Sequence, residues 1–457
     1  MPNPIQNQTV SRLAQQWEQQ WQRVNSPDHL TMQRPFGQSP VPAGGGVLAP
    51  PSQIFGADKL QLNFGSTVRK APIEMLQQQA SASSINRAVD LATGTRNTYN
   101  NRVQLLVDGD EAFGKMREMI DSARQSIFLE MFIYHDDETG WDIARRLVEK
   151  KKQGVDVKVL LDGLGTVSEK GATIKFLRDN GVDVQIFNKQ LFDWENVNIT
   201  HRKLVLVDGY KGMTGGMNVG DEYAHLWHDL MATIEGEGVQ ELQREFFIDW
   251  TKAGGQMPAR IPMIPPGMQF GQSATRVTVT SPNEAGKEKD TKNALISAVH
   301  SALHHIYLVN PYFSDPDLIE ALTAAAKRGI EVKILLPGVS DNPVHAVLNK
   351  QNAEKLMAAG AKVFRVDPGK DEKVFTHAKL MTIDGVWVSM GTTNYDTRAL
   401  ENNQEINISV TDPQFAKTVE DRLFRYNPHA LLPMNSKDFG TWERVKAKVY
   451  SFFDKAL

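Results

Sequence analysis

The chain has 457 residues, of which 51 are basic and 54 acidic, giving a formal net charge of −3, and it contains no cysteine. This length is sufficient for two or three domains with cores of their own. The near balance of charge provides no global attraction to nucleic acid or anionic lipid, so a basic surface would have to be local. The lack of cysteine excludes disulfides, a thiol nucleophile and cysteine-bound zinc, and leaves the redox compartment open.

The sequence offers no obvious membrane span. No apolar run approaches the ~18 residues of a spanning helix, and the first residues lack the basic start and apolar core of a secretory signal. We therefore expect a protein that is cytoplasmic or peripheral at a membrane, while a secreted form stays open.

Residues 1–98 form an N-terminal extension rich in Gln, Ser and Pro, and its glycine run at 44–46 is typical of a linker or of disorder. One amphipathic helix is predicted within it, because apolar residues recur at helical spacing. The stripe consists of Val10, Leu13, Trp17, Trp21 and Val24. Membrane contact and packing on the rest of the chain are both open, and the few basic residues beside the stripe favour packing.

A first α/β half is predicted over residues 99–253, where apolar strand patterns alternate with amphipathic helix patterns. Strands are expected at 103–107, 127–134, 155–161 and 182–187, with helices at 111–123 and 141–153. The strand at 155–161 is almost continuously apolar, as in a parallel or mixed sheet covered on both faces.

A second half is predicted over residues 276–430, because the pattern repeats. The segment 329–338 resembles 154–163, and 306–309 resembles 127–130 at a similar separation along the chain. This internal duplication predicts an α/β fold of two similar halves, each a mixed sheet flanked by helices. A pseudo-two-fold axis would bring the two halves to one central site in a monomer.

Two further segments complete the predicted organisation. A linker at 254–275 contains four prolines that preclude regular structure; its apolar residues either touch lipid or pack between the halves, and packing is favoured. Those residues are Ile261, Met263, Ile264, Met268 and Phe270. Residues 431–457 are predicted to end in an amphipathic helix with interspersed basic residues, which suits an anionic membrane surface but more often docks on a core.

One pattern occurs twice with identical spacing. Residues 200–209 read THRKLVLVDG and residues 376–385 read THAKLMTIDG, so both follow H-x-K-x-x-x-x-D-G. After the same gap, each copy continues into a small-residue turn that ends in asparagine, at 215–218 and 391–394. Two matching copies do not arise from composition alone, so this pattern predicts a duplicated site.

The apolar residues inside each copy are typical of a strand, in which alternate side chains share a face. His201 and Lys203 would then point to one face and Asp208 to the other, and His377, Lys379 and Asp384 repeat this arrangement. Asp208 and Asp384 complete the two motifs as catalytic candidates, yet this alternation and the Asp-Gly turn favour a role in capping the strand end.

The chemistry of these residue types points to phosphate. Lys203, Lys379, Asn218 and Asn394 can donate hydrogen bonds to phosphate oxygens and stabilise a five-coordinate transition state without a metal. Two histidines can divide the remaining work: one attacks phosphorus, and the other protonates the leaving alkoxide and then deprotonates the incoming hydroxyl. The pattern therefore predicts a phosphohistidine intermediate and no cofactor.

Each histidine needs a partner that fixes its tautomer and position. A carboxylate follows at the same spacing in both copies: Asp229 comes after His201, and Glu405 comes after His377. These two are the candidates for that orienting role, and the spacing leaves open which carboxylate serves which histidine.

The duplicated motif resembles that of the phospholipase D superfamily, and its flanks are similar to those of bacterial cardiolipin synthases. The similar flanks are residues 198–203, 215–223, 227–229, 246–250 and 396–405. The likeness extends from about residue 102 to about residue 426. It implies a bacterial, membrane-associated enzyme with a histidine-phosphatidyl intermediate, transfer to a second lipid alcohol, and His201 as the nucleophile.

The chain departs from that family in two places. Family members often carry N-terminal transmembrane helices, which are not visible here. The serine that usually follows the motif glycine is replaced by Gly216 in one copy and by Thr392 in the other, so a supporting hydroxyl is expected only from the second copy.

Other functions remain open at this stage. Water could resolve the same intermediate, which would make the protein a phospholipase D that releases phosphatidic acid. A nuclease of the superfamily would need a basic, aromatic-lined groove, which the sequence does not suggest, so no nucleic-acid partner is expected. A lipid-binding scaffold would not need two complete motifs.

Two minor sets of residues carry weaker signals. One set lies where strands end and is either pocket lining for the alcohol or ordinary strand residues: Glu130, Tyr134, Asn310, Tyr312 and Phe313. The other set is His300, His304 and His305, whose spacing on a helix would suit a metal, but no third-ligand pattern accompanies them. We therefore predict no metal site.

Overall fold

The computed structural model describes residues 73–166, 171–188, 199–282, 288–367, 375–425 and 431–435. Residues 77–457 form one compact unit. The apolar stripe predicted between residues 10 and 24 and the C-terminal helix predicted after residue 435 lie outside the described residues. Within the described part of the chain, no helix combines the length and the apolar character needed to cross a bilayer.

The first half contains a seven-stranded mixed sheet of strand order β1-β7-β6-β5-β2-β3-β4. Its strands are β1 (Asn101–Val107), β2 (Ser126–Met131), β3 (Asp156–Asp162), β4 (Asp183–Phe187), β5 (Leu204–Val207), β6 (Lys211–Gly215) and β7 (Leu230–Gly236). β2, β3 and β4 are parallel, and the other neighbours pair antiparallel.

The second half contains a nine-stranded sheet of order β16-β12-β11-β10-β13-β14-β15-β8-β9. Its strands are β8 (Ala274–Ser281), β9 (Glu288–Lys289), β10 (His305–Val309), β11 (Glu331–Leu336), β12 (Lys362–Val366), β13 (Leu380–Ile383), β14 (Trp387–Gly391), β15 (Glu405–Thr411) and β16 (Leu431–Pro433). Without β9 and β16, this order repeats that of the first sheet strand for strand, so the predicted duplication is confirmed.

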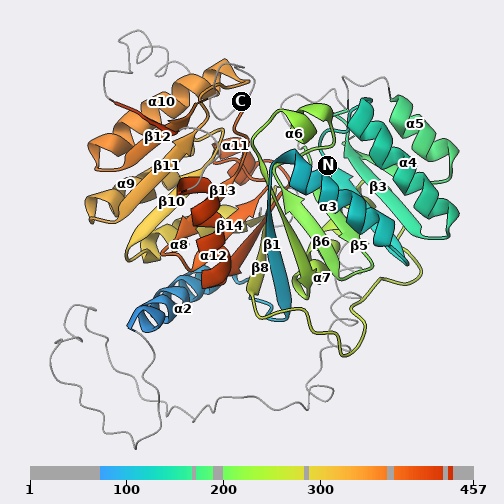
Figure 1. The fold of residues 1–457 in the computed structure, drawn as a ribbon, viewed down its shortest axis with the longest axis horizontal. Helices are drawn as coiled ribbons and strands as arrows, with labels where there is room; N and C mark the ends of the chain where they lie inside the picture. Colours follow the sequence, from blue (N-terminus) through green and yellow to red (C-terminus); the bar gives the residue numbers. More distant parts are fainter. Residues whose placement is uncertain are drawn as a thin grey trace, which may run out of the picture. The chain divides into compact units, whose positions relative to one another are not determined.

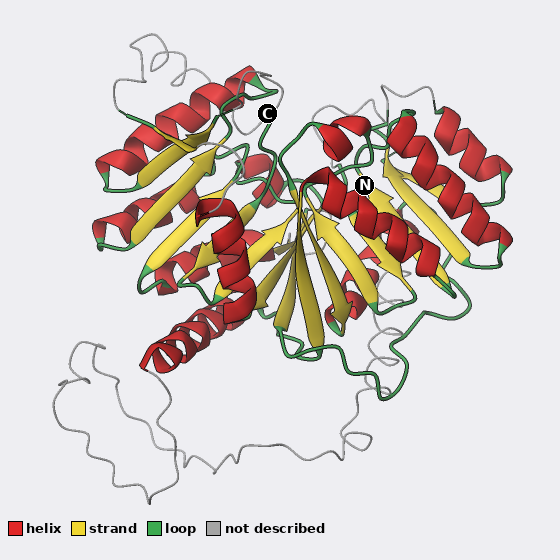
Figure 2. Ribbon diagram, viewed as in Figure 1, coloured by secondary structure: helices red, strands yellow, loops and turns green. Residues whose placement is uncertain are grey.

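Helices flank both sheets (Figures 1 and 2). In the first half they are α3 (Asp108–Ser122), α4 (Glu138–Lys152), α5 (Ala172–Asp179), α6 (Asp221–His225) and α7 (Gly238–Lys252). In the second half they are α8 (Asp290–Ser301), α9 (Pro316–Lys327), α10 (Pro343–Ala358), α11 (Thr397–Glu401) and α12 (Pro413–Glu420), followed by a π-helical turn at Asp421–Arg425. The predicted fold class, two α/β halves with mixed sheets flanked by helices, is therefore confirmed.

Each half has its own apolar core. In the first half, Phe113 of α3 and Leu147 of α4 pack with Ile127 of β2 on one face of the sheet. On the other face, Phe246 of α7 stacks on Phe128 at 5.3 Å between ring centroids. Because β2 is fully buried, its two faces both meet a helix layer, which explains why most of its residues are apolar.

A long helix that the sequence patterns did not predict, α2 (Ile73–Thr93), lies within the proposed N-terminal extension. Its residues Ile85 and Val89 are fully buried in the core of the second half, and Asn86 accepts a hydrogen bond from Thr411 of β15. Its apolar residues are sparse among Gln and Ser, so its sequence resembles the polar stretch before it. The C-terminal part of the extension is thus part of the folded body.

Residues 254–273 connect the halves without a helix or strand, as the prolines predict. Phe270 stacks on Tyr210 at 5.8 Å, and the carbonyl of Pro262 accepts a hydrogen bond from Gln243 of α7 at 2.8 Å. Met268 is 37% exposed. These contacts favour the packing interpretation of the apolar linker residues.

The motif strands are shorter than predicted. β5 begins at Leu204 and β13 at Leu380, so each histidine and lysine precedes its strand and does not lie within it. The expected alternation of faces therefore does not apply to His201 and Lys203. The reason is tertiary: the backbone at residues 200 and 376 pairs with the other half of the molecule, which ends the pairing within each sheet.

Candidate active site

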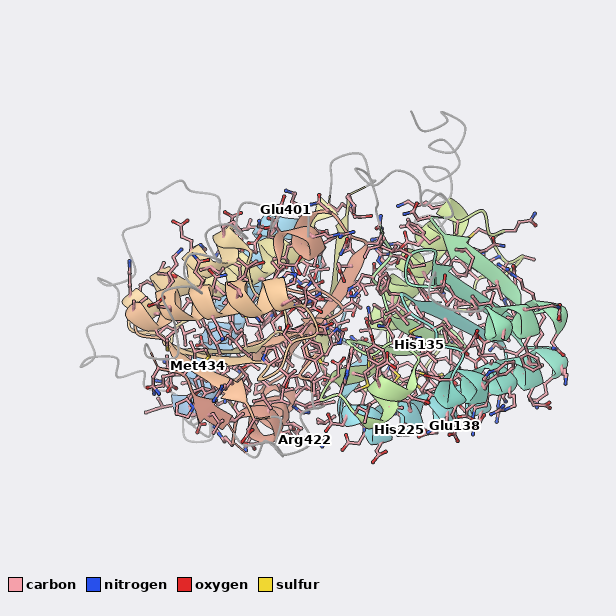
Figure 3. All side chains as sticks on the ribbon, turned by 90° about the horizontal axis from the view of Figure 1, so that it is seen from above. His135, Glu138, His225, Glu401, Arg422 and Met434 are labelled. Carbon is pink, nitrogen blue, oxygen red and sulfur yellow. The ribbon has the colours of Figure 1, made fainter. Side chains whose placement is uncertain are left out.

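The two motifs meet through backbone pairing between the halves. Thr200 forms a parallel bridge with Gln404, and Thr376 forms the equivalent bridge with His228. The amide of His201 donates to the carbonyl of Gln404 at 2.9 Å, and the amide of His377 donates to the carbonyl of His228 at 2.9 Å. The same contact occurs in both directions, so the pseudo-two-fold axis passes between the motifs. Figure 3 shows the two halves from above, with His135 and His225 on the first and Glu401 on the second.

Each histidine is oriented by a carboxylate from the other half. Nδ1 of His201 lies 2.9 Å and 3.1 Å from the two oxygens of Glu405, and Nδ1 of His377 lies 2.8 Å from Oδ2 of Asp229. A neutral imidazole that donates from Nδ1 presents the lone pair of Nε2 for chemistry. The equal spacing in the two copies pointed to Asp229 and Glu405, and the structure shows that each lies against the histidine of the other half.

The electrostatics of the site favour neutral histidines. Burial lowers the pKa of His201, and burial together with the ammonium of Lys379 lowers the pKa of His377 to about 3. For Asp229, burial acts to raise the pKa, but His377 and Lys379 outweigh it and hold the carboxyl below its ordinary range. Both imidazoles are therefore neutral, which is the state that an attacking histidine requires.

Two buried lysines flank the histidines. Lys203 donates to the carbonyl of His201 at 2.7 Å, and Lys379 donates to the carbonyl of His377 at 2.5 Å. Burial lowers the pKa of Lys203 to about 7 and that of Lys379 to about 8. Two ammonium groups with so little hydration form a site that favours an anion, because the anion stabilises the positive charges in place of the missing water.

The turns after the motifs support the two carboxylates in different ways. The hydroxyl of Thr392 donates to Oε2 of Glu405 at 2.5 Å. In the first half, a Cβ added to Gly216 would overlap both carboxylate oxygens of Asp229. The shorter aspartate thus occupies the space that a side chain at 216 would need, whereas the longer glutamate leaves room for a threonine. The expected hydroxyl is therefore present in one half only.

The two asparagines are buried beside the motifs but differ in their contacts. Asn218 accepts a hydrogen bond from the amide of Ile133 at 3.0 Å and donates to the hydroxyl of Tyr223 at 2.8 Å. The side-chain oxygen of Asn394 is buried without a hydrogen-bond partner among the described residues. The structure thus gives Asn218 a positioning role in the turn, while Asn394 retains unused hydrogen-bonding capacity.

Aromatic rings surround the histidines unequally. The ring of Phe132 lies 5.0 Å from His201. Among the residues that the structure describes, three rings lie near His377: Trp227 at 5.2 Å, Phe375 at 5.6 Å and Tyr223 at 5.9 Å between ring centroids. The site is therefore symmetric in its charged groups and asymmetric in its apolar surroundings.

Behind the first motif lies a buried ionic cluster. Arg202, fully buried, lies 3.0 Å from Asp249 and 3.1 Å from Glu245, both on α7. Glu130 accepts a hydrogen bond from Thr200 at 2.6 Å, and burial, followed by the charge of Asp249, raises its pKa. This cluster fixes the residues on either side of His201 to α7; Ala378 takes the place of Arg202 in the second motif.

The motif aspartates lie at the far end of the motif strands. Asp208 accepts hydrogen bonds from the amides of Gln125 at 2.7 Å and Ser126 at 3.0 Å, and Asp384 accepts them from His304 and His305 at 2.8 Å and 2.9 Å. Strands β5 and β13 separate them from the histidines. This geometry agrees with the predicted capping role and offers no contact for a catalytic one.

Of the five residues proposed for an alcohol pocket, four have structural contacts, and one of them, Glu130, belongs to the buried ionic cluster behind the first motif. Tyr134 is fully buried and donates to the carbonyl of Gly140 at 2.8 Å, Phe313 belongs to the second core, and Asn310 accepts hydrogen bonds from the amides of Tyr312 and Tyr395. Tyr312 lies nearer to the histidines, with its ring 6.5 Å from Phe375.

The three histidines with metal-like spacing do not share a helix. His300 lies in the last turn of α8, and His305 opens β10, where its Nε2 lies 2.8 Å from Glu420. Among the described residues, the carboxylates that come close enough together to hold a cation are Asp315, Asp317 and Glu401. The ammonium of Lys292 already lies within 2.8 Å of all three.

Sequence reasoning did not single out Phe375, Arg202 or Glu245 for the site. Phe375 directly precedes the second motif where the first has Ile199, and that difference between the two copies was a usable signal. The buried cluster gave no comparable signal, since charged residues on α7 resemble a solvated helix face until the sheet is placed against them.

Comparisons with known proteins identify the family of the chain. The chain matches the family model described as "Cardiolipin synthase, PLD-like domain" over residues 116–250 and 295–426. It is 34% identical over 335 residues to cardiolipin synthase A of Pseudomonas syringae pv. syringae, covering 71% of this chain and 68% of that protein. It is 31% identical over 336 residues to cardiolipin synthase of Listeria monocytogenes serotype 4a, with the same shares.

Solved structures show the same fold at low sequence identity. The crystal structure of phosphatidylserine synthase from Haemophilus influenzae aligns with a TM-score of 0.59 and 14% identity, covering 81% of this chain and 97% of that one. Polyphosphate kinase from Porphyromonas gingivalis aligns with a TM-score of 0.51, also at 14% identity, covering 78% of this chain and 53% of that one. At this identity the likeness concerns the fold alone.

Proposed function

Because the chain belongs to the cardiolipin synthase family of proteins with phospholipase D-like domains, we propose that it is a phosphatidyltransferase that acts on glycerophospholipids. It transfers a phosphatidyl group from one phospholipid to the hydroxyl of another, such as phosphatidylglycerol. The observation that carries the proposal is the crossed pair of hydrogen bonds, His201 with Glu405 and His377 with Asp229.

In the first step, Nε2 of His201 attacks phosphorus, and the bond from phosphorus to the head-group oxygen breaks. His377 delivers a proton to that oxygen. In the free protein His377 is neutral, because burial lowers its pKa to about 3. The anionic phosphodiester raises this pKa when it enters, since a negative charge favours the imidazolium, so substrate binding supplies the conditions for the acid.

In the second step, His377 accepts the proton of the incoming lipid hydroxyl, whose oxygen attacks phosphorus and releases His201. Lys203 and Lys379 stabilise the negative charge of both transition states through charge-assisted hydrogen bonds. The side-chain amide of Asn394 donates a further hydrogen bond, and Asn218 holds the turn. Because amines and amides carry this charge, we expect turnover to persist in EDTA.

The experiment that tests this function uses purified protein and vesicles of phosphatidylglycerol in the presence of EDTA, with the lipid products identified by mass spectrometry. Cardiolipin and free glycerol are the expected products. Phosphatidic acid alone would instead indicate a hydrolase. Activity that returns only on addition of one divalent ion would contradict the metal-free mechanism.

The site would face its lipid substrate at a membrane surface, so the protein is proposed to associate peripherally. Binding to the vesicles in a flotation assay, with and without turnover, tests this association separately. A His201→Asn variant that floats with vesicles but produces no cardiolipin would separate binding from catalysis. Full activity in that variant would contradict the assignment of the nucleophile.

A further inference from the structure

His228 connects the first half to the second motif through its main chain. Its amide donates to the carbonyl of Phe375 at 3.0 Å, and its carbonyl accepts from the amide of His377 at 2.9 Å. The next residue, Asp229, holds the ring of His377 through Nδ1 at 2.8 Å. The placement of residues 228 and 229 therefore determines both the backbone position and the ring orientation of His377.

Asp108, the first residue of α3, contacts both of these residues. Nδ1 of His228 lies 2.7 Å from Oδ1 of Asp108, and the amide of Asp229 donates to the same oxygen at 3.3 Å. In return, the amide of Asp108 donates to the carbonyl of Asp229 at 2.9 Å. Three contacts from one residue thus hold the segment that positions His377.

The backbone of Asp108 is left-handed, with a φ of 63°. Residues other than glycine rarely adopt this conformation, although aspartate tolerates it better than most. β1 pairs with β7 up to Val107 opposite Leu230, so the chain turns directly after that pair and brings the carboxylate of Asp108 against residues 228 and 229. A strained conformation that the structure maintains beside a reactive residue points to a functional role.

The turn at Asp108 is also attached to the second half. Glu111, which lies one turn further along α3, accepts a hydrogen bond from the amide of Val107 at 2.9 Å. Its carboxylate accepts two more, at 2.9 Å and 2.8 Å, from Arg422 in the π-helical turn after α12. Asp108 therefore lies in a turn whose position both halves fix.

The other half has a neutral pair at the equivalent place. Gln404 is equivalent to His228 when the sequence is aligned on the motif histidines, and it forms the same two main-chain contacts with the first motif segment. Its Oε1 accepts a hydrogen bond at 2.7 Å from Ser281, at the end of the strand β8 that is equivalent to β1. Both bridging residues thus have a side-chain anchor, and the anchor is an aspartate only on the side of the second motif.

We propose that Asp108 is a positioning residue for His377, which it reaches through His228 and Asp229. This inference rests on the proposed function, in which His377 protonates the leaving alcohol and deprotonates the incoming one. Proton transfer requires hydrogen-bond distance, so a small displacement of this histidine removes much of the rate. The contacts that orient His201 come from the second half, so Asp108 acts on one histidine only.

Two variants separate the side chain of Asp108 from its backbone. Asp108→Gly adopts the left-handed conformation without strain and removes the carboxylate. Asp108→Asn keeps an oxygen that accepts from His228 and from the amide of Asp229, and asparagine also tolerates this conformation. The asparagine variant should retain at least about half of the activity, because its hydrogen bonds remain.

The test compares two leaving groups with the full-length protein. Phosphatidylglycerol requires a proton on the departing glycerol oxygen, whereas phosphatidyl-p-nitrophenol releases a stable anion that leaves without one. Rapid quench after mixing with vesicles of each lipid measures the first turnover. In Asp108→Gly, first-turnover release of glycerol should fall about tenfold or more, while release of p-nitrophenol and the KM for phosphatidylglycerol should each change by less than about twofold.

Two controls accompany this comparison. Ser281→Ala removes the anchor of Gln404 on the side of His201, which attacks both substrates, so it should slow both releases by the same factor. Asp110→Ala removes an exposed carboxylate from the same first turn of α3, and it should leave both releases unchanged.

A double variant tests the route from Asp108 to the site. His228→Phe removes Nδ1 and should show the same dependence on the leaving group, and it tests the proposal by itself if Asp108→Gly fails to fold. The combination of both substitutions should lose no more activity than the more affected single variant, because the two residues act in one chain of contacts. Losses that add in the double variant would contradict this route.

Three results would overturn the inference and leave the proposed function intact. The first is unchanged glycerol release in Asp108→Gly, and the second is an equal loss of glycerol and p-nitrophenol release in that variant. The third is a loss in Asp108→Asn as large as in Asp108→Gly. If the unmodified protein yields no cardiolipin, phosphatidic acid or free glycerol from phosphatidylglycerol, the proposed function fails and this inference fails with it.

Discussion

At the scale of single residues, the two buried lysines determine the expected pH dependence. Their pKa values, about 7 for Lys203 and about 8 for Lys379, are lowered from an ordinary 10.5. A lysine is charged only below its pKa, so the free protein loses its anion-binding charge as pH rises through 7 to 8. We expect kcat/KM to fall over this range, and kcat to fall only at higher pH, because bound phosphate raises both values. Initial rates between pH 6 and 9.5 would measure this, and a flat profile would contradict it.

The same lysines make the folded protein more stable as pH rises, whereas they make its kcat/KM fall. Between about pH 7 and 10.5 the unfolded chain binds more protons than the folded one, so the free energy of unfolding rises with pH through this window. Replacement of Lys203 by Met should reduce that rise. Urea unfolding at pH 7 and pH 9 on both proteins would measure the difference.

A second prediction at this scale concerns the unequal support of the two carboxylates. Thr392→Val removes the hydroxyl that donates to Glu405, and we expect kcat to fall roughly tenfold, since a hydrogen bond to a charged group contributes about 1.5–3 kcal/mol. Gly216→Ala forces Asp229 away from His377, because the added Cβ would overlap the carboxylate. A displaced histidine can cost about a hundredfold in rate.

The control for the glycine is Gly114→Ala in α3, where an added Cβ meets no atom within 4 Å. It should leave kcat unchanged and stability equal or slightly higher. An active Gly216→Ala variant with a normal melting temperature would show that Asp229 is free to move without consequence, contrary to the close fit described above.

These residues could be identified from the sequence, but the contacts between them could not. The equal spacing after each histidine identified Asp229 and Glu405, and the residue types identified the lysines. The crossing of the pairs was not accessible, because it depends on how distant parts of the chain meet in space. The meaning of Gly216 was equally hidden, since a missing side chain gives no sign of which atom occupies its place.

At the scale of elements, the buried cluster behind the first motif connects the motif segment to α7. Arg202→Leu would remove the fully buried cation between Glu245 and Asp249 and leave them only the more exposed Arg244 and Lys252, and breaking a buried pair in this way costs about 3–5 kcal/mol. We expect the free energy of unfolding to fall by that amount in chemical denaturation.

The control for this prediction shares an acceptor with Arg202. Arg244 also pairs with Glu245, at 3.0 Å, but its side chain is 45% exposed. Arg244→Leu should cost no more than about 1 kcal/mol. Equal effects of the two substitutions would mean that burial does not govern the strength of this cluster.

Helix α2 and the motif segments show where element prediction failed. The mixture of Gln, Ser and Ala in α2 has too few apolar residues for a clear stripe, yet two buried residues, Ile85 and Val89, suffice to dock it. The motif segments have alternating residues like a strand, but pairing between the halves takes precedence at His201 and His377. In both cases tertiary contacts decided the outcome, which local patterns do not contain.

At the scale of the whole molecule, the crossed pairs predict distinct kinetic defects. Glu405→Gln should impair His201, the nucleophile, and so slow formation of the phosphohistidine. Asp229→Asn should impair His377, which acts as the acid of the first step and the base of the second, and so slow both the formation and the resolution of the phosphohistidine. Rapid acid quench with labelled phosphatidylglycerol measures the covalent intermediate, and we expect little of it in the first variant and more in the second. The opposite pattern would mean that the histidine roles are reversed.

The two-half architecture was the most predictable feature of the molecule, because a repeated pattern in the sequence requires a repeated fold. The strand order of the second sheet repeats that of the first, and each motif lies at the boundary of its half. The aromatic asymmetry was not predicted. The sequence does contain the difference, for example Phe375 where the first copy has Ile199, but the contacts of these rings depend on neighbours from separate loops.

The crossed pairing also constrains which substitutions the sequence can accept during evolution. A change in the first half that removes Asp229 damages the histidine of the second half, and the reverse holds for Glu405. Exchanging Gly216 and Asp229 for the Thr and Glu of the other half needs two substitutions, and the intermediate with Thr alone contains a clash. Selection therefore acts on the halves jointly, and the first half cannot acquire the threonine of the second while Asp229 is in place.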